Sequence, residues 1–340
     1  MSLIAVDWYI EKLRRKVNDS APLKLTIPSE AYRGNKRNQV FFYNPSNPTD
    51  KNFATPIEAF TELAFIGGQT QEQTIMRSKN LFIPIDANRL ISNGLGNPAD
   101  APNMVNKIDV RFASNKTYIT KDELAVLDVI TSNIYDRAIY FAVTCKNDKL
   151  LGLNDYMQLE GLGLRIIPVK SPSVKELSIY GGGRVAEKKV YNNVMNKWAF
   201  GGFDTEDTFV DESYAAEVQA MKIIMMRAAE EFLQIGDKQK AGDLAMKFFE
   251  GFPHMNFPYD DSVIPFIEAL NQADMKEEAM KHTDILANEL SQRMIFYDSL
   301  DEDDFESFKQ DYGYALRGTT ETLQVIEKLA TLVLHKKSET

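Results

Sequence analysis

Apolar residues recur with two different spacings, and the change divides the chain into two parts. Short alternating runs, typical of half-buried β-strands, fill the first part. They lie at 23–27, 39–43, 81–85, 108–112 and 164–169. Helical spacing occurs between them, at 7–18, 56–65 and 120–130. The last of these helices begins with Thr120-Lys121-Asp122-Glu123, which has the pattern of a capping box. Residues 137–144 are almost continuously apolar and are predicted to form a central strand.

Helical patterns dominate the second part, where two helical hairpins are predicted. Their turns lie at 235–237 and 272–274, and each second helix carries a small residue, Ala241 or Ala279. These two alanines are 38 positions apart, close to the period of about 34 residues in tetratricopeptide repeats. A helix at 319–334 is expected to cap the stack. An ordinary antiparallel helical bundle remains the alternative.

We therefore predict an α+β N-terminal domain over 1–208, followed by an all-α tetratricopeptide-like helical hairpin domain over 209–340. Residues 170–208 are expected to form a turn-rich connector with one short helix at 191–197. A length of 340 residues fits roughly two domains.

Charge and composition narrow the function classes. The 49 acidic residues outnumber the 39 basic ones, which argues against nonspecific nucleic-acid binding and predicts no nucleic-acid partner. The single cysteine, Cys145, excludes an internal disulfide and a cysteine-based zinc site, and a buried, inert thiol is expected there. The three histidines are scattered. We predict neither a metal site nor a cofactor.

Three short segments could carry chemistry, and each has a plainer interpretation. Gly181-Gly182-Gly183-Arg184 lacks the spacing of a phosphate-binding loop, so a flexible turn is expected. The acidic run 301–306 lacks the glycine of a calcium loop and fits a solvated helix start. Asp7, Trp8 and Tyr9 could form a sugar-binding platform, or belong to a docking helix whose aromatic rings fill the core.

The termini give further expectations. No apolar run approaches the roughly 20 residues that span a bilayer, and the start lacks the features of a signal peptide. Structured-looking sequence begins at Ile4, as expected either of a natural N-terminus or of a piece cut from a longer chain.

Several motifs resemble, in their order, the soluble C-terminal region of a Bacteroidetes family of multi-pass membrane proteins. Those proteins look like protein O-mannosyltransferases and are assigned to glycosyl transfer. The motifs lie at 6–10, 127–128, 133, 137–142, 151–153, 156–162, 165, 168–169, 191–197 and 201–202. The chain departs from the family at Ala138, where a proline is usual.

The resemblance implies that the chain lacks an N-terminal membrane module, which would hold the lipid-linked sugar site and the acidic catalytic residues. The present part would face the periplasm, attached to the membrane through residue 4. No catalytic residue of the family maps onto this chain. The positions that carry the family signature, without an assigned role, are Asp7, Trp8, Tyr9, Asn133, Arg137, Tyr140, Gln158, Glu160 and Gly161.

Three serines match the Asp-Ser-apolar pattern of O-glycan acceptors in this phylum. They are Ser20, Ser262 and Ser299. Solvated turns or helix starts account for the same pattern.

Three functions follow. In the first, the chain is the non-catalytic periplasmic portion of a membrane glycosyltransferase-like protein, with the missing membrane module, an acceptor protein or a glycan as partner. The second is a free-standing tetratricopeptide-like interaction scaffold. The third is a soluble carbohydrate-active enzyme, so enzymatic activity stays open, although none is expected of this chain alone.

Overall fold

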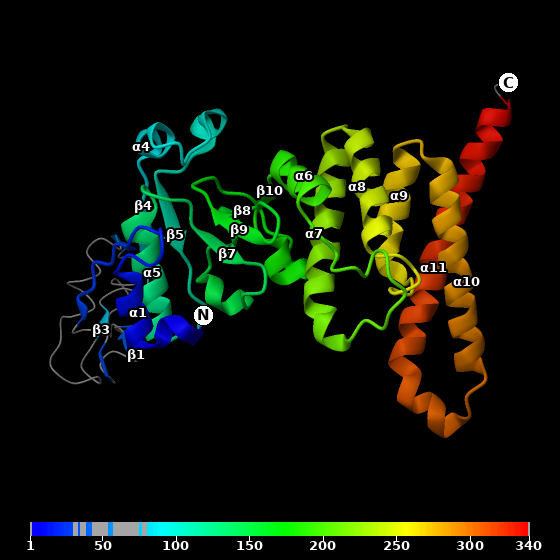
Figure 1. Ribbon diagram of the computed structural model, residues 1–340, viewed down its shortest axis with the longest axis horizontal. Helices are drawn as coiled ribbons and strands as arrows, with labels where there is room; N and C mark the ends of the chain where they lie inside the picture. Colours follow the sequence, from blue (N-terminus) through cyan, green and yellow to red (C-terminus); the bar gives the residue numbers. More distant parts are fainter. Residues whose placement is uncertain are drawn as a thin grey trace. The chain divides into compact units, whose positions relative to one another are not determined.

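The computed structural model describes residues 2–29, 33–34, 39–42, 54–56, 75–76 and 80–338. The chain divides into two compact units, Met1–Arg184 and Val185–Thr340. The first unit holds small β-sheets together with helices, and the second is helical (Figure 1). This confirms the predicted order of an α+β region followed by an all-α region of packed helix pairs. The predicted domain limits, 1–208 and 209–340, stay a prediction.

Three small sheets make up the β-structure of the first unit. In one, β1 (Gln39–Phe42) lies between β3 (Ile75–Met76) and β6 (Tyr118–Thr120). In another, β4 (Asn80–Pro84) lies between β2 (Ala54–Pro56) and β5 (Lys107–Val110). The third has the order β10 (Arg184–Val185), β8 (Met157–Leu159), β9 (Gly163–Ile166), β7 (Tyr140–Ala142). The strands predicted at 39–43, 81–85, 108–112 and 164–169 are thus confirmed within a few residues.

The helices of the first unit are short apart from one. They are α1 (Asp7–Leu13), α4 (Ala87–Ser92) and α5 (Lys121–Asn133). Short 3₁₀ helices lie at Ser2–Ala5, Pro98–Asn103, Asn147–Leu150, Asn154–Tyr156 and Lys175–Gly181. The helix predicted at 7–18 ends five residues early, and all but the first residue of the one predicted at 56–65 lie outside the described residues.

The apolar run 137–144 does not form the predicted central strand. It contributes only β7, three residues long, which pairs with β9 at the edge of its sheet. Of these three residues only Phe141 is buried, whereas Tyr140 is 47% exposed. Apolar composition alone therefore overstated the burial of this segment, because one face of an edge strand can remain in solvent.

The segment 23–27, predicted as a strand, pairs with no strand in the described part of the chain. The side chains of α5 satisfy its backbone instead. The Asp128 carboxylate accepts hydrogen bonds from the backbone N–H groups of Thr26 and Ile27, each at 2.9 Å. The Asn133 amide bonds both ways with the backbone of Lys24, accepting at 3.0 Å and donating at 2.8 Å. A helix face thus takes the place of a neighbouring strand.

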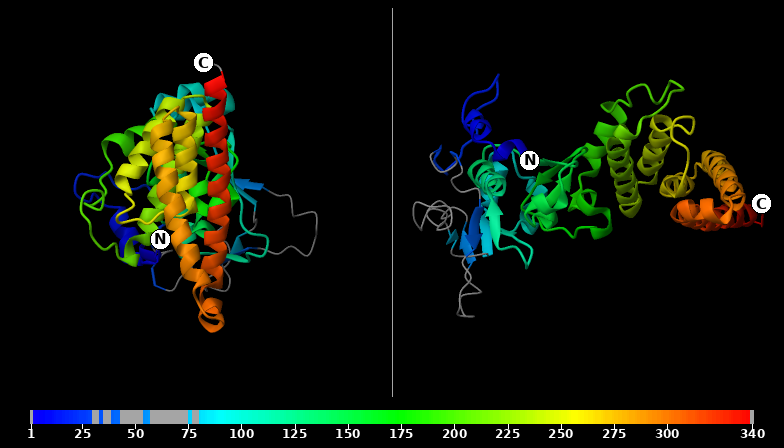
Figure 2. Two further views of the ribbon diagram at one scale, coloured as in Figure 1. Left: turned by 90° about the vertical axis from the view of Figure 1, so that its right-hand side faces the viewer. Right: turned by 90° about the horizontal axis from the view of Figure 1, so that it is seen from below.

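The second unit consists of helices that pack on their neighbours along the chain (Figures 1 and 2). They are α6 (Glu187–Asn196), α7 (Ala215–Gln234), α8 (Lys238–Gly251), α9 (Ile264–Gln272), α10 (Lys276–Asp298) and α11 (Glu302–Ser338), with 3₁₀ turns at Glu212–Tyr214 and Asp261–Val263. Ala241 and Ala279 are fully buried, as close helix packing requires. The predicted capping helix 319–334 is part of the much longer α11. Among the described residues, no helix has both the length and the apolar character needed to cross a membrane.

A buried histidine lies in the aromatic core of the second unit. The His282 ring stacks on Phe249 with a centroid distance of 3.5 Å, and its Nδ1 lies 2.9 Å from the Tyr259 hydroxyl. The residue is 6% exposed. Burial, reinforced by repulsion from Lys281, lowers the pKa of His282 from 6.5 to about 4. The folded unit therefore holds this imidazole neutral at pH values where the unfolded chain would bind a proton.

We expect the second unit to lose stability as the pH falls from about 6.5 towards 4. Because the depressed pKa of His282 lets only the unfolded state take up the proton, the loss should reach about 3 kcal/mol at most. Urea unfolding followed by circular dichroism at pH 7.5 and pH 4.5 measures it. His282→Gln should reduce this pH dependence. Equal pH dependence in the wild type and His282→Gln would contradict the assignment.

Candidate functional site

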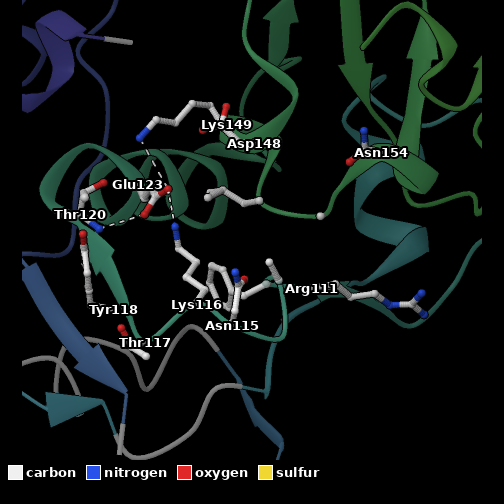
Figure 3. A pocket seen from close by; sticks show the side chains of 14 residues that line it. Arg111, Asn115, Lys116, Thr117, Tyr118, Thr120, Glu123, Asp148, Lys149 and Asn154 are labelled. Atoms are coloured by element: carbon white, nitrogen blue, oxygen red, sulfur yellow. Dashed lines mark hydrogen bonds and ion pairs between the residues drawn. The ribbon is translucent and has the colours of Figure 1, made fainter. Parts of the chain in front are cut away.

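A cavity of about 520 Å³ opens in the first unit beside the start of α5 (Figure 3). Three parts of the chain contribute to its wall: the loop from β5 to β6, the first turn of α5, and the segment after β7. The lining residues are Arg111, Phe112, Ala113, Asn115, Lys116, Thr117, Tyr118, Thr120, Glu123, Asp148, Lys149, Leu151, Gly152 and Asn154. Ten of the fourteen lining side chains carry a polar group, and Phe112, Ala113 and Leu151 add apolar surface.

Two lysines converge on one buried carboxylate in this cavity. Lys116 Nζ lies 2.8 Å from Glu123 Oε1, and Lys149 Nζ lies 3.6 Å from the same oxygen. Figure 3 shows the two lysines approaching Glu123 from opposite sides. Glu123 is 2% exposed, and its Oε2 also accepts a hydrogen bond from the Thr120 N–H at 2.9 Å. The carboxylate therefore has two hydrogen-bond donors, Lys116 and the Thr120 N–H, and a second ion-pair partner, Lys149.

The first turn of α5 places these groups. Thr120 and Glu123 form the predicted capping box, which fixes where the helix begins. Asp122 and Glu123 both lie in this first turn, where the helix dipole favours negative charge. Burial alone would raise the pKa of Asp122, but hydrogen bonds from Thr120 and Lys149 outweigh it and hold this pKa below its usual value. Asp122 therefore stays ionised and keeps Lys149 in place, with Nζ 3.0 Å from Asp122 Oδ2.

Two consecutive residues with positive φ shape the opposite wall. Leu151 has φ 56° and Gly152 has φ 72°. A Cβ atom at Gly152 would collide with the carbonyl oxygen of Arg111. Glycine thus permits both the left-handed backbone and the close approach of this segment to the end of β5.

The arrangement favours binding over cleavage. Glu123 accepts two hydrogen bonds and is ion-paired with Lys116 and Lys149, and Asp148 is the other carboxylate in the lining. Glycosidase chemistry needs two available carboxyl groups about 5–9.5 Å apart. The amide of Asn115 and the hydroxyls of Thr117 and Tyr118 line the cavity, where a polar ligand could contact them. In the chain as described, no cluster of three or more His, Cys, Asp or Glu residues could hold a metal ion.

The residues that carry the family signature lie outside this cavity. A first group of them contacts the N-terminal segments. Asp7 accepts a hydrogen bond from Lys121 at 2.8 Å and another from the Gly34 N–H. Trp8 is 61% exposed and contacts the Tyr9 ring edge-on. Asn133 binds Lys24, as described above. Arg137 donates to the carbonyl oxygens of Ala21 and Pro22 at 3.3 and 3.1 Å. The contacts of Asp7, Asn133 and Arg137 therefore hold the N-terminal segments against α5 and the residues that follow it.

A second group of signature residues meets on the sheet of β7–β10. The Tyr140 hydroxyl donates to Glu160 Oε2 at 2.6 Å, and the Gln158 amide donates to Glu160 Oε1 at 2.6 Å. Arg184 Nε donates to Gln158 Oε1 at 2.8 Å. Burial, together with the hydrogen bond to Glu160, raises the pKa of Tyr140 to about 12. Gly161 lies in the turn from β8 to β9.

The candidate acceptor serines occupy turns and helix boundaries. Ser20 is exposed and pairs with Val17 in an isolated β-bridge. Ser262 contacts the side chain of Asp260 just before α9. Ser299 follows α10 and donates to the Phe296 carbonyl oxygen at 2.7 Å. Modification of these serines stays a prediction.

The remaining sequence predictions concern the acidic run 301–306, the glycines 181–183 and Cys145. The acidic run does begin a helix, since Asp301 accepts the Asp304 N–H at 2.9 Å. Gly181–Gly183 is not a flexible turn: it is buried, and a Cβ at Gly183 would collide with the Met157 carbonyl oxygen. Cys145 is half-buried rather than buried.

Sequence reasoning did not identify the cavity. Its capping box was recognised, but only as a helix start. Lys116 and Lys149, the residues on either side of Glu123, belong to no recognisable motif. Asp122 and Glu123 in the first turn of α5 were the one signal of the cavity that the sequence offered, because carboxylates that become buried require cationic partners.

Comparison with known proteins finds a family match for the first part of the chain. The model of the family described as TMEM260-associated domain 2 matches residues 1–186. This segment corresponds closely to the first compact unit, which ends at Arg184. Comparisons with curated proteins and with solved structures give no match.

Proposed function

Because the chain belongs to the TMEM260-associated domain 2 family, we propose that it is the non-catalytic binding part of a membrane glycosyltransferase-like protein. The resemblance to the soluble region of O-mannosyltransferase-like proteins supports this proposal. It includes a periplasmic location and a separate membrane module as partner. The family match does not bear on the Bacteroidetes assignment.

The cavity beside α5 carries the more specific part of the proposal, which is that the first unit binds a glycan. Its volume of about 520 Å³ falls within the usual range for small-ligand sites, roughly 300–1,000 Å³. Sugar hydroxyls need partners that both donate and accept, and the amides and hydroxyls of the lining provide them. The rings of Phe112 and Tyr118 add apolar surface for a sugar face. The ion pairs of Glu123 with Lys116 and Lys149 keep these groups in position.

We expect the purified chain to bind a mannose-containing oligosaccharide, as measured by isothermal titration calorimetry. The double variant Asn115→Ala/Thr117→Val should bind at least tenfold more weakly, since each lost hydrogen bond contributes about 1 kcal/mol. Asn192→Ala, at an exposed asparagine of α6 in the other unit, is the matched control and should bind like the wild type.

Two results would contradict this function. The first is unchanged affinity in the double variant across a panel of glycans. The second is sugar transfer from a lipid-linked donor by the purified chain, which would show a catalytic activity that the proposal denies.

The interaction scaffold remains the second candidate function, and the packed helix pairs of the second unit favour it. The natural reading frame of the gene distinguishes the two candidate functions. Multi-pass membrane segments encoded in the same frame support the glycosyltransferase-like parent, whereas a frame without them favours the scaffold.

A further inference from the structure

The hairpin of α10 and α11 ends in a part that buries none of its side chains. We call residues 291–314 the hairpin tip; each of them is at least partly exposed. The flanking residues Leu290 and Ala315, by contrast, are only 2% and 5% exposed. Figures 1 and 2 show the orange end of the hairpin extending past α9. The tip therefore consists of the end of α10, the connecting turn and the start of α11, and all of its residues keep some contact with solvent.

An aromatic cluster joins the two helices of the tip. Its members are Phe296, Tyr297, Phe305, Phe308 and Tyr312. Two helices cannot enclose so many rings, and Phe296 and Phe308 stay 49% and 37% exposed. Ile295 beside them is 67% exposed. Aromatic side chains exposed together in this way are typical of the centre of a protein–protein interface.

Strong negative charge surrounds this apolar patch. The tip has two basic residues, Arg293 and Lys309, and seven acidic ones: Asp298, Asp301, Glu302, Asp303, Asp304, Glu306 and Asp311. Arg293 is paired with Glu289 at 3.1 Å. Lys309 is paired with Glu306 at 2.8 Å. The acids of the first turn of α11 stabilise that helix, but Asp298 lies in the last turn of α10, where the helix dipole disfavours it. Helix stability thus does not account for the whole charge.

We propose that the hairpin tip docks a basic amphipathic segment of a partner protein. The apolar side chains of that segment cover Ile295, Phe296 and Phe308, and its lysines and arginines face the surrounding carboxylates. Charge complementarity selects this occupant. A second copy of the tip would bring two acidic surfaces together, and an anionic membrane would be repelled. The surface is separate from the glycan cavity and does not depend on the proposed function.

The experiment measures fluorescence anisotropy of a labelled 14-residue Leu/Lys amphipathic peptide titrated with the full chain. Ile295→Ser/Phe296→Ser should weaken binding at least tenfold. Asp298→Asn/Asp303→Asn should weaken it about threefold and reduce its dependence on salt. Leu323→Ser, 57% exposed on α11 outside the tip, is the matched control and should leave affinity unchanged. A Leu/Glu peptide of the same length should not bind.

Several outcomes would overturn the proposal. These are failure of the Leu/Lys peptide to bind, equal binding of the Leu/Glu peptide, and equal loss of affinity in the Leu323→Ser control. Sedimentation that shows a dimer dispersed by Ile295→Ser/Phe296→Ser would identify a second copy as the occupant instead. Because Asp298 and Asp303 are exposed, their variant keeps the fold and tests the charge requirement even if the apolar variant loses helicity.

Discussion

Replacing Asp128 by alanine is expected to destabilise the first unit by about 4 kcal/mol, since several buried donors would lose their acceptor. Asp128 is 2% exposed and accepts four hydrogen bonds. They come from the Thr26 N–H and hydroxyl, the Ile27 N–H and the Ser132 hydroxyl, at 2.8–2.9 Å. Urea unfolding of the first unit measures the loss. Hydrogen exchange at the Ile27 amide should accelerate in parallel.

Asp136→Ala is the matched control for this variant. Asp136 pairs with Lys24 on the same docked segment, but the Lys24 side chain is 68% exposed. Exposed ion pairs contribute about 0–1 kcal/mol, so the control should be nearly neutral. Equal destabilisation by the two variants would show that the carboxylate at 128 does not anchor the segment.

Gly152→Ala should destabilise the first unit by about 3–4 kcal/mol, the range expected when a left-handed backbone and a steric collision act together. The new methyl group would meet the Arg111 carbonyl oxygen, so the wall of the cavity must shift. We therefore also expect a loss of oligosaccharide binding. Thermal unfolding and calorimetric titration measure the two effects.

The variant Gly94→Ala separates the contribution of the left-handed backbone from that of the steric collision. Gly94 has φ 71°, nearly that of Gly152, but a Cβ there meets nothing within 4 Å. It should lose only the conformational part, about 1–2 kcal/mol. If both variants lost the same stability, the collision at Gly152 would have no measurable role.

Local patterns predicted those elements whose stabilising partners lie nearby in the sequence. The capping box of α5 needs only Thr120 and Glu123, three residues apart, and it is present. The small residues Ala241 and Ala279 marked the helix crossings, because close packing leaves no room for a larger side chain.

The features that were predicted wrongly depend on partners that lie far away in the sequence. The pattern at 23–27 indicated an extended backbone, but its partners Asp128 and Asn133 lie on a helix about a hundred residues away. The run 137–144 was apolar enough for a central strand, but sheet order placed it at an edge. The cavity is assembled from 111–123 and 148–154, so no single stretch of sequence could have revealed it.

The docking of residues 23–27 onto α5 also sets an order of events during synthesis. The hydrogen bond from Thr26 to Asp128 spans 102 residues, and the one from Lys24 to Asn133 spans 109. At about 5–20 residues per second, the ribosome needs roughly 5–20 s between making the segment and making its anchor. Throughout that interval the backbone groups of this segment have only water as partners, so the segment stays accessible to chaperones and to other chains. The first unit should therefore fold late and slowly, limited by the closure of one long loop.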